Sequence, residues 1–323
     1  MLIWPDIHFE KAVVADSLGQ YDAPRLRFSK AEYLPTGWLG LVAYTLGLPQ
    51  LAVANPAALL ASMLGIQGSA WIATPLQFMA GLQTVHLPQN GILCLEEAER
   101  AELVHSFEYV FGATTQRLRL QSVAADTFIL TGLEADLAIT VDPSRVLGRN
   151  IESALPFGET SGCVRALLSE IEMWLHGQPL NLKREAQGLP RISSLWLWGG
   201  GAASYVRYVV ASPQAPTEKL IGLLPPLFYG DDSLLSALCY LGGAERRPLP
   251  HTKCLNELLE SSTSAVCYVA PFDHEFFTIL LASLQKGDFK TLTVVANDHK
   301  VQISRRDSWY FWRQKNDIFK ALS

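Results

Sequence analysis

The stretch from Tyr33 to Leu95 contains no Asp, Glu, Lys or Arg. A stretch of this length without charged side chains is typical of a protein core or of a membrane segment. Its apolar segments are interrupted at Pro49-Gln50 and Asn55-Pro56, before they reach the roughly 18 residues that a membrane span needs. No cluster of Lys and Arg flanks them either. We therefore expect buried strands and helices joined by polar turns, and peripheral membrane association through this stretch is the alternative.

The composition agrees with a folded protein that has a large core. Hydrophobic residues make up 49% and charged residues 18% of the 323 residues, which excludes a disordered chain. The net charge of −5 gives no electrostatic signature of nucleic-acid binding, which requires a basic face, so no nucleic-acid partner is expected.

The five cysteines do not form a recognisable framework. Their positions show no CxxC spacing, which argues against a structural zinc site. We interpret them as small buried side chains in a reducing compartment, and therefore expect a cytoplasmic protein. The cysteines are Cys94, Cys163, Cys239, Cys254 and Cys267.

The middle of the chain reads as a small α+β unit. Apolar residues at helical spacing predict a helix over Glu96–Phe111 and another over Val164–Leu175, which Gly177 would end. Between them, Thr127–Thr131 and Ala138–Val141 have the composition of strands.

The last part of the chain alternates strands with helices, as α/β domains do. We therefore predict an α/β core formed by residues 1–85 and 191–323, with an inserted, smaller α+β cap domain at 86–190. The expected elements of the last part are strands at 195–198, 265–269 and 292–296 and helices at 232–241 and 275–284.

Two segments carry residues that suit anion binding. Gly199, Gly200 and Gly201 follow a short apolar strand, and such a turn can present backbone N–H groups to a phosphate. The polar string His176–Gly188 contains Arg184, which could clamp a phosphate or carboxylate. The alternatives are a tight glycine turn and a loop that satisfies its own backbone.

Two Asp-His pairs suit a metal. Asp273-His274 and Asp298-His299 each follow a predicted strand, and the carboxyl ends of strands are where α/β sheets place ligands. Two isolated pairs are also compatible with polar loop residues.

Taken together, these segments resemble the archaeal-type cofactor-independent phosphoglycerate mutases of the alkaline-phosphatase superfamily. The most similar segment is His176–Pro190 followed by Leu195–Gly201, which resembles the family pattern HPVN..R...G..PAN..WLWG.G. Asn297-Asp298-His299 is similar to the family's late SDH ligand pair, and Asp273 could stand for the Asp of its DEAGH motif. The likeness spans roughly residues 50 to 300.

The resemblance implies an alkaline-phosphatase-like fold in which a serine beside two divalent metals transfers a phosphoryl group. If Ser62–Ile66 matches the family's SLLGY, the nucleophile and the following Asp fall near Pro56-Ala57, inside the charge-free stretch. The His position of the DEAGH motif is Phe277. We therefore interpret the chain as a degenerate bacterial-type relative that has lost this chemistry.

The sequence thus favours a regulatory or scaffolding protein that acts by binding and needs no cofactor. We expect an unidentified protein partner, and a phosphorylated small molecule as a further ligand, held by Asn181, Arg184, Gly199, Gly200 and Gly201. The alternative is a metal-dependent phosphoglycerate mutase or phosphatase with a rearranged site. In that case Asp273, Asp298 and His299, with His274, would hold Mn²⁺, Mg²⁺ or Zn²⁺.

Overall fold

The computed structural model divides into two compact units of nearly equal length. The first unit is formed by Met1–Val53 and Pro213–Ser323, and the second by Ala54–Ser212. The structure describes residues 1–4, 25–26, 31–53, 55–81, 84–113, 117–211, 227–248, 265–268, 274–296, 298–304 and 316–317.

The first unit is built on a seven-stranded sheet with the order β12-β11-β13-β1-β14-β15-β3. The first five of these strands run parallel, whereas β15 and β3 are each antiparallel to their neighbour. The strands are β1 (Leu2–Trp4), β3 (Glu32–Tyr33), β11 (Leu227–Tyr229), β12 (Arg246–Arg247), β13 (Ala265–Tyr268), β14 (Thr291–Ala296) and β15 (His299–Ser304).

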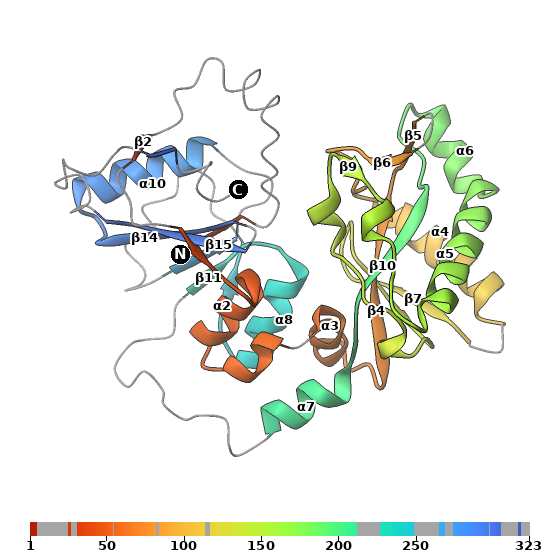
Figure 1. Cartoon of the computed structure of the whole chain (residues 1–323), viewed down its shortest axis with the longest axis horizontal. Coiled ribbons are helices and arrows are strands. Elements are labelled where there is room, and N and C mark those ends of the chain that lie inside the picture. Colours follow the sequence, from red (N-terminus) through yellow and green to blue (C-terminus); the bar gives the residue numbers. More distant parts are fainter. Residues whose placement is uncertain are drawn as a thin grey trace. The chain divides into compact units, whose positions relative to one another are not determined.

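Helices cover both faces of this sheet (Figure 1). The crossover through α8 (Ser233–Gly242) leads from β11 outward to β12, whereas the crossover through α10 (His274–Lys286) leads in the other direction, from β13 across β1 to β14. Since such crossovers are right-handed, the two helices must lie on opposite faces. In Figure 1, α10 lies on one face, and α8 lies on the other with α2 (Gly37–Thr45).

The second unit contains an antiparallel four-stranded sheet with the order β10-β4-β8-β7. β4 (Ser69–Leu76) lies inside this sheet, and its side chains are buried from Ala70 to Leu76 on both faces. This explains why its sequence lacks the polar alternation of a half-exposed strand. The other strands are β7 (Arg119–Ser122), β8 (Phe128–Thr131) and β10 (Ser194–Ala202).

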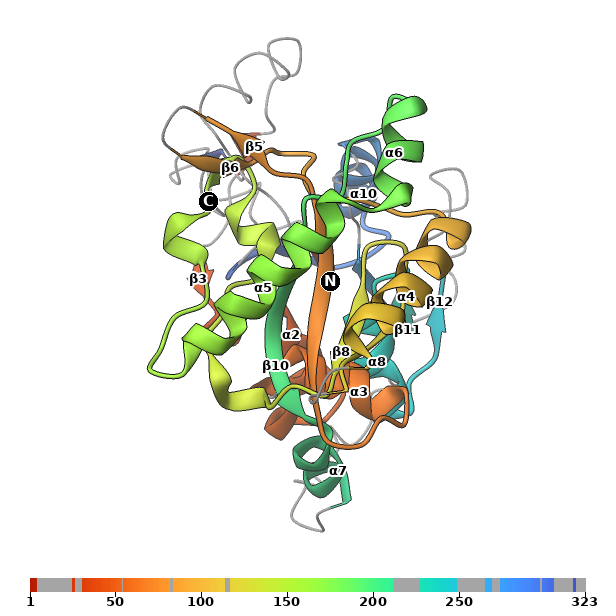
Figure 2. The same ribbon diagram turned by 90° about the vertical axis from the view of Figure 1, so that its right-hand side faces the viewer.

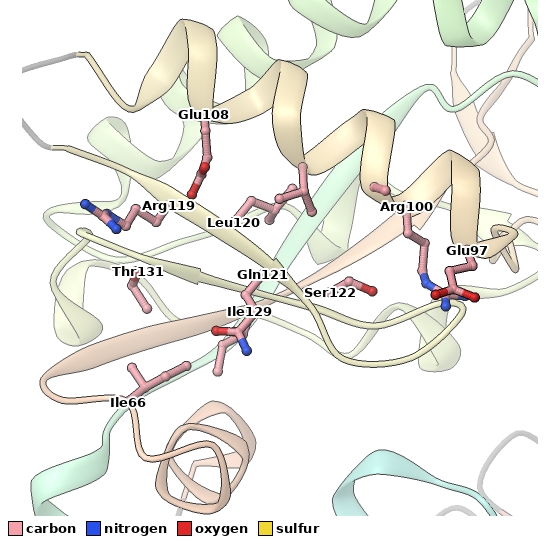
Figure 3. A pocket seen from close by; sticks show the side chains of 12 residues that line it. Ile66, Glu97, Arg100, Glu108, Arg119, Leu120, Gln121, Ser122, Ile129 and Thr131 are labelled. Atoms are coloured by element: carbon pink, nitrogen blue, oxygen red, sulfur yellow. The ribbon is translucent and has the colours of Figure 1, made fainter.

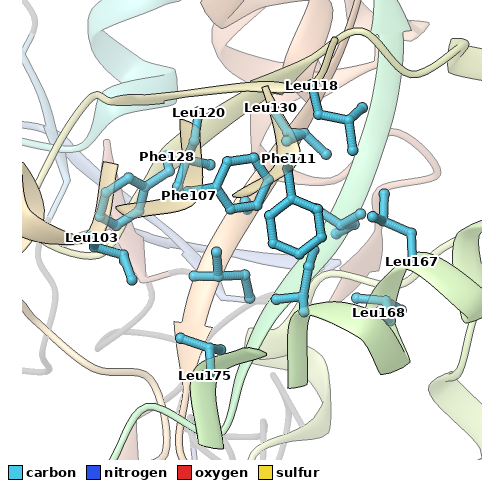
Figure 4. Close-up of a cluster of buried hydrophobic side chains, with 14 of the residues drawn as sticks. Leu103, Phe107, Phe111, Leu118, Leu120, Phe128, Leu130, Leu167, Leu168 and Leu175 are labelled. Carbon is cyan, nitrogen blue, oxygen red and sulfur yellow. The ribbon is translucent and has the colours of Figure 1, made fainter. Parts of the chain in front are cut away.

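Two long helices, α4 (Glu97–Phe111) and α5 (Ser161–His176), pack against this sheet (Figure 2). α4 begins with a capping box, in which Glu96 accepts from the N3 backbone and the Glu99 side chain accepts from the Glu96 N–H. The helices contribute Leu, Val, Ile and Phe side chains to one buried cluster with β4, β7, β8 and β10 (Figure 4). Phe107 and Phe111 stack at 4.5 Å between ring centroids, and Trp174 meets both edge-on.

Shorter elements complete the two units. None of the helices in the described part of the chain combines the length and the apolar character that a membrane crossing requires. The remaining helices and strands are α3 (Pro56–Met63), α6 (Pro179–Ala186), α7 (Ala203–Ala211), β2 (Arg25–Leu26), β5 (Met79–Ala80), β6 (Val85–Leu87), β9 (Arg149–Asn150) and β16 (Asn316–Asp317).

The division of the chain differs from the boundaries expected at 86 and 190. The expected strand 195–198 belongs to β10, whose partner is β4 of the second unit, with Trp196 opposite Thr74. Both strands therefore belong to the inserted unit, which is nearly as long as the first. No strand forms over the expected range 138–141, where a single bridge joins Ile139 to Phe157.

The cysteines follow the burial expectation only in the first unit. Cys239 and Cys267 are buried there, whereas Cys94 and Cys163 of the second unit are exposed. Cys254 lies outside the described residues. Burial raises the pKa of both Cys239 and Cys267 to about 11, so these thiols are neutral at physiological pH.

Candidate functional site

The carboxyl edge of the parallel strands in the first unit holds the Asp298-His299 pair. Asp298 lies in the turn after β14, and its backbone carbonyl accepts from the Leu34 N–H at 2.6 Å. His299 begins β15 opposite Ala296, the last residue of β14. Its ring meets the Tyr33 ring edge-on, with centroids 5.5 Å apart. The pair therefore lies where an α/β sheet binds ligands, as its sequence position predicts.

The other predicted ligand, Asp273, lies outside the described residues. Asp231 and Asp232, after β11, add carboxylates to the same edge. Asp232 caps α8 by accepting from the Leu235 N–H at 2.7 Å, and Asp231 pairs with Arg246 at 3.1 Å. Within the described part of the chain, no three His, Cys, Asp or Glu side chains gather as metal ligands.

The polar string between His176 and Gly188 forms a helix, not the expected loop. Pro179 opens α6 at its first turn, where its missing N–H costs nothing. Gly188 ends the helix with φ +73. The N–H of Gly188 bonds to Glu185 and the N–H of Leu189 bonds to Arg184, which is a Schellman motif. The stop signal was thus present in the sequence at Gly188.

Asn181 is a buried residue of this helix, and its side chain is hydrogen-bonded to backbone groups. Its amide N–H groups donate to the carbonyls of Leu175 at 2.8 Å and Ile192 at 2.9 Å. Its carbonyl accepts from the Ile192 N–H at 2.8 Å. Both donors and one acceptor position are therefore used, which leaves Asn181 a structural role in joining α6 to the end of α5 and to the segment just before β10.

Arg184 is likewise buried and paired inside the second unit. Its Nε donates to the Pro190 carbonyl at 2.7 Å, and its Nη1 lies 2.5 Å from Glu99 Oε1. The side chains of Arg184 and Glu99 are only 4% and 14% exposed. Because Glu99 also closes the capping box of α4, one carboxylate ties α6 to the start of α4. An anionic ligand would have to displace this pair.

Gly199, Gly200 and Gly201 form part of β10 and not a turn after it. A bulge separates Trp198 from Gly201, and the pairing with β4 then resumes at Ala70. A Cβ atom on Gly200 would lie 2.7 Å from the Trp71 ring and 2.8 Å from the Ala135 carbonyl oxygen. The glycines therefore allow neighbouring chain segments to approach β10 closely.

A cavity of about 500 Å³ adjoins Gly199 and Gly200. The Gly199 N–H donates to Thr140 Oγ1 at 3.1 Å, so it is not presented to a ligand. Among the described residues that line the cavity, Asp136 and Glu159 carry the charges, and none is Lys, Arg or His. This lining is unfavourable for a phosphate.

A larger cavity, of about 630 Å³, follows the outer edge of β7 (Figure 3). We call it the β7 groove. Its lining comes from one side of α4, from all four residues of β7, from Ile129 and Thr131 of β8, and from the loop before β4. The lining residues are Ile66, Glu97, Arg100, Ala101, Val104, Glu108, Arg119, Leu120, Gln121, Ser122, Ile129 and Thr131.

Sequence reasoning did not find this groove. Glu97 and Arg100 were visible as the polar side of an amphipathic helix, but their partner strand β7 was not among the expected strands. The alternation of Arg119, Leu120, Gln121 and Ser122 is the only local signal for that strand, and it is four residues long.

The comparisons with known proteins give distant structural similarity only. No protein-family model matches the sequence, and no curated protein matches it. The chain is similar to the cofactor-independent phosphoglycerate mutase from Thermoplasma acidophilum DSM 1728, with 15% identity, a TM-score of 0.40, and coverage of 99% of this chain and 93% of the other. It is also similar to the PH0037 protein from Pyrococcus horikoshii, with 11% identity, a TM-score of 0.44, and coverage of 94% and 86%. At these identities the function has to be inferred from the chain's own residues.

Proposed function

We propose that this protein acts by binding, as a regulatory or scaffolding protein, and that it has lost phosphoryl-transfer chemistry. The observation that carries the proposal lies at Pro56-Ala57, where the sequence resemblance puts the nucleophile. Pro56 is the first residue of α3, and the Ala57 side chain is fully buried. Neither residue has a hydroxyl or a carboxylate that could attack a phosphate or hold a metal.

The nearest polar side chains in that segment are engaged in the fold. Asn55 donates from Nδ2 to the Gly200 carbonyl at 2.6 Å, and Ser62 donates to the Ala203 carbonyl at 3.3 Å. Asn181 and Arg184, from the most specific part of the resemblance, are occupied in the same way. These contacts support a fold whose former site positions now serve packing.

A metal-dependent phosphatase or mutase is the second candidate, and the place of Asp298 and His299 at the carboxyl edge of the parallel sheet favours it. Hard divalent ions prefer such carboxylate and imidazole ligands. Asp273 and His274 would complete the set, and the metal would supply charge stabilisation to a phosphoryl group.

The experiment that separates the candidates measures turnover of 3-phosphoglycerate and of p-nitrophenyl phosphate by the full chain, with Mn²⁺, Mg²⁺, Zn²⁺ or Co²⁺. Elemental analysis of the purified protein accompanies it. We expect no turnover above the background without protein, and metal well below one ion per chain.

The matched variants are Asp298→Ala and Asp288→Ala. Asp288 is an exposed carboxylate between α10 and the amino end of β14, so it lies away from the carboxyl edge. Metal-dependent turnover that Asp298→Ala abolishes and Asp288→Ala retains would overturn the binding proposal in favour of the enzyme.

A further inference from the structure

β7 is the outer strand of the four-stranded sheet, since β8 pairs with it on one side and no described strand pairs with it on the other. An outer strand has one row of backbone N–H and C=O groups that its own sheet does not use. Such a row can pair with an added strand.

The register identifies the residues whose backbone groups face outward. Val123 follows the last paired residue of β7, and its N–H donates to the Thr127 carbonyl at 2.9 Å, so this N–H points toward the β8 side. Hydrogen-bonded and non-bonded pairs alternate, and the next bonded residue along β7 is therefore Gln121. It follows that the N–H and C=O groups of Leu120 and Ser122 point away from β8, toward the open side.

The β7 groove runs along this open side. Its lining includes residues from both faces of the sheet, Leu120 on the face toward α4 and Arg119 and Gln121 on the other. Only a cavity that follows the strand edge can touch both faces. Its volume of about 630 Å³ is ample for a short extended segment, and Ala101 and Val104 of α4 give it an apolar wall.

The charges on the two sides of the groove differ. Glu97 and Glu108 line it from α4, whereas Arg119 lines it from the opposite face of β7. Within the described part of the chain, none of these three side chains forms an ion pair. Arg100 also lines the groove from α4, and it has a partner within the fold, because it donates to the Leu95 carbonyl at 2.9 Å.

We propose that the β7 groove binds an extended peptide segment of a partner protein, which adds to β7 as a further strand. Because side chains alternate between the faces of a strand, the segment places basic and small apolar side chains toward α4 and an acidic side chain toward Arg119. This inference deepens the proposed binding function, on which it rests, by naming the surface and the chemistry of the partner.

A second copy of this chain fits the groove less well. If two β7 strands paired around Gln121, the incoming strand would place Leu120 and Ser122 on the face toward α4. Neither residue carries a positive charge, so Glu97 and Glu108 would remain without cationic partners. Charge complementarity therefore favours a heterologous segment.

The test titrates the full chain with a fluorescent synthetic peptide of the sequence Lys-Glu-Val-Glu-Lys-Glu, followed by fluorescence anisotropy. As a strand, this peptide has Lys, Val and Lys on one face and Glu on the other. The control peptide has the same composition in an order that mixes the charges on both faces. We expect tighter binding of the alternating peptide.

The variant Ser122→Pro removes an outward N–H without removing a bond to β8, so the sheet can keep its fold. We expect it to weaken binding at least about tenfold, because proline both lacks the donor and blocks the edge. Arg119→Ala should weaken binding roughly two- to fivefold. Arg149→Ala, which removes an exposed cation of the same unit outside the groove, should leave binding unchanged.

Melting temperatures of all variants are measured alongside. If Ser122→Pro does not fold, the same question is put to the unmodified protein with a peptide whose alternate amides are N-methylated, which should also bind at least about tenfold more weakly. Equal affinity for both peptides, or binding that Ser122→Pro and N-methylation leave intact, would overturn the proposal. So would a dimer of the chain that Ser122→Pro dissociates, since the edge would then serve self-association.

These results are independent of the turnover assay. Metal-dependent turnover with intact peptide binding would contradict the proposed function and leave the groove assignment in place. If neither turnover nor peptide binding is observed, the groove assignment is contradicted and the proposed function stands.

Discussion

The parallel sheet of the first unit and the antiparallel sheet of the second differ in where their polar residues lie. In the first unit, Asp231 follows β11 and the Asp298-His299 pair follows β14, so these residues lie at the same edge of the sheet without forming one cluster. In the second unit, Asn181 and Arg184 are buried and bonded to neighbouring segments. In the second unit, the residues of the most motif-like segment, Asn181 and Arg184, therefore stabilise the fold. In the first unit, the isolated Asp298-His299 pair lies at the carboxyl edge of the parallel strands.

The largest expected effect tests whether Arg184 is structural. Arg184→Ala leaves Glu99 almost buried and without its cation, which should lower the free energy of unfolding by about 3 kcal/mol. Lys183, the neighbour of Arg184 in α6, is the matched control, because it pairs with Glu102 of α4, the helix that carries Glu99, but with side chains 60% and 36% exposed. Lys183→Ala should cost less than about 1 kcal/mol.

Urea titrations followed by tryptophan fluorescence provide the measurement for both variants. If Arg184→Ala and Lys183→Ala lowered the free energy of unfolding by similar amounts, the buried pair would contribute no more to stability than the exposed one. A structural role for Arg184 would then lose its support, and a ligand could displace Glu99 at little cost.

A smaller effect tests the close approach at β10. Gly200→Ala places a methyl group 2.7 Å from the Trp71 ring, and we expect a loss of about 1–3 kcal/mol from overpacking. Gly162→Ala in α5 meets nothing within 4 Å and should raise stability by about 0.5 kcal/mol, through helix propensity. Thermal unfolding of the two variants distinguishes the cases, and an unchanged melting temperature for Gly200→Ala would show that the strand can move away.

The smallest effect compares the thiols of the two units. The raised pKa values of Cys239 and Cys267, about 11, mean that at pH 8 only about one thiol in a thousand is ionised. Raising the pH toward 11 restores the thiolate. We therefore expect iodoacetamide at pH 8 to alkylate the exposed Cys163 well before either buried thiol, as followed by peptide mass spectrometry. Early labelling of Cys239 or Cys267 would show that the first unit opens locally.

Local patterns in the sequence predicted the elements that have clear ends and a strong apolar period. The helix expected over 96–111 is α4, and the one expected over 232–241 is α8, which Asp232 caps. The apolar spacing from Val164 to Leu175 gives the buried side of α5. In these segments the local preference and the tertiary packing agree.

The errors occur where pairing between distant residues decides the structure. β10 and β4 join Trp196 to Thr74, and no local pattern shows that these strands share a sheet outside the parallel core. The glycines after Trp198 suggested a turn, whereas the packing of Trp71 against Gly200 accounts for them. The β7 groove was missed for a similar reason, because it exists only once α4 lies beside β7.

The central position of β1 has a consequence for the synthesis of the chain. Leu2 pairs with Cys267 on one side and Val294 on the other, so β1 is synthesised about 265 residues before the first of these two partner residues. At roughly 5–20 residues per second this delay is on the order of tens of seconds. The second unit is contiguous and has all its strands within Ala54–Ser212, so it can complete its pairing during that time. Nascent chains of this protein should therefore expose β1 to chaperones long after their middle portion has formed its sheet.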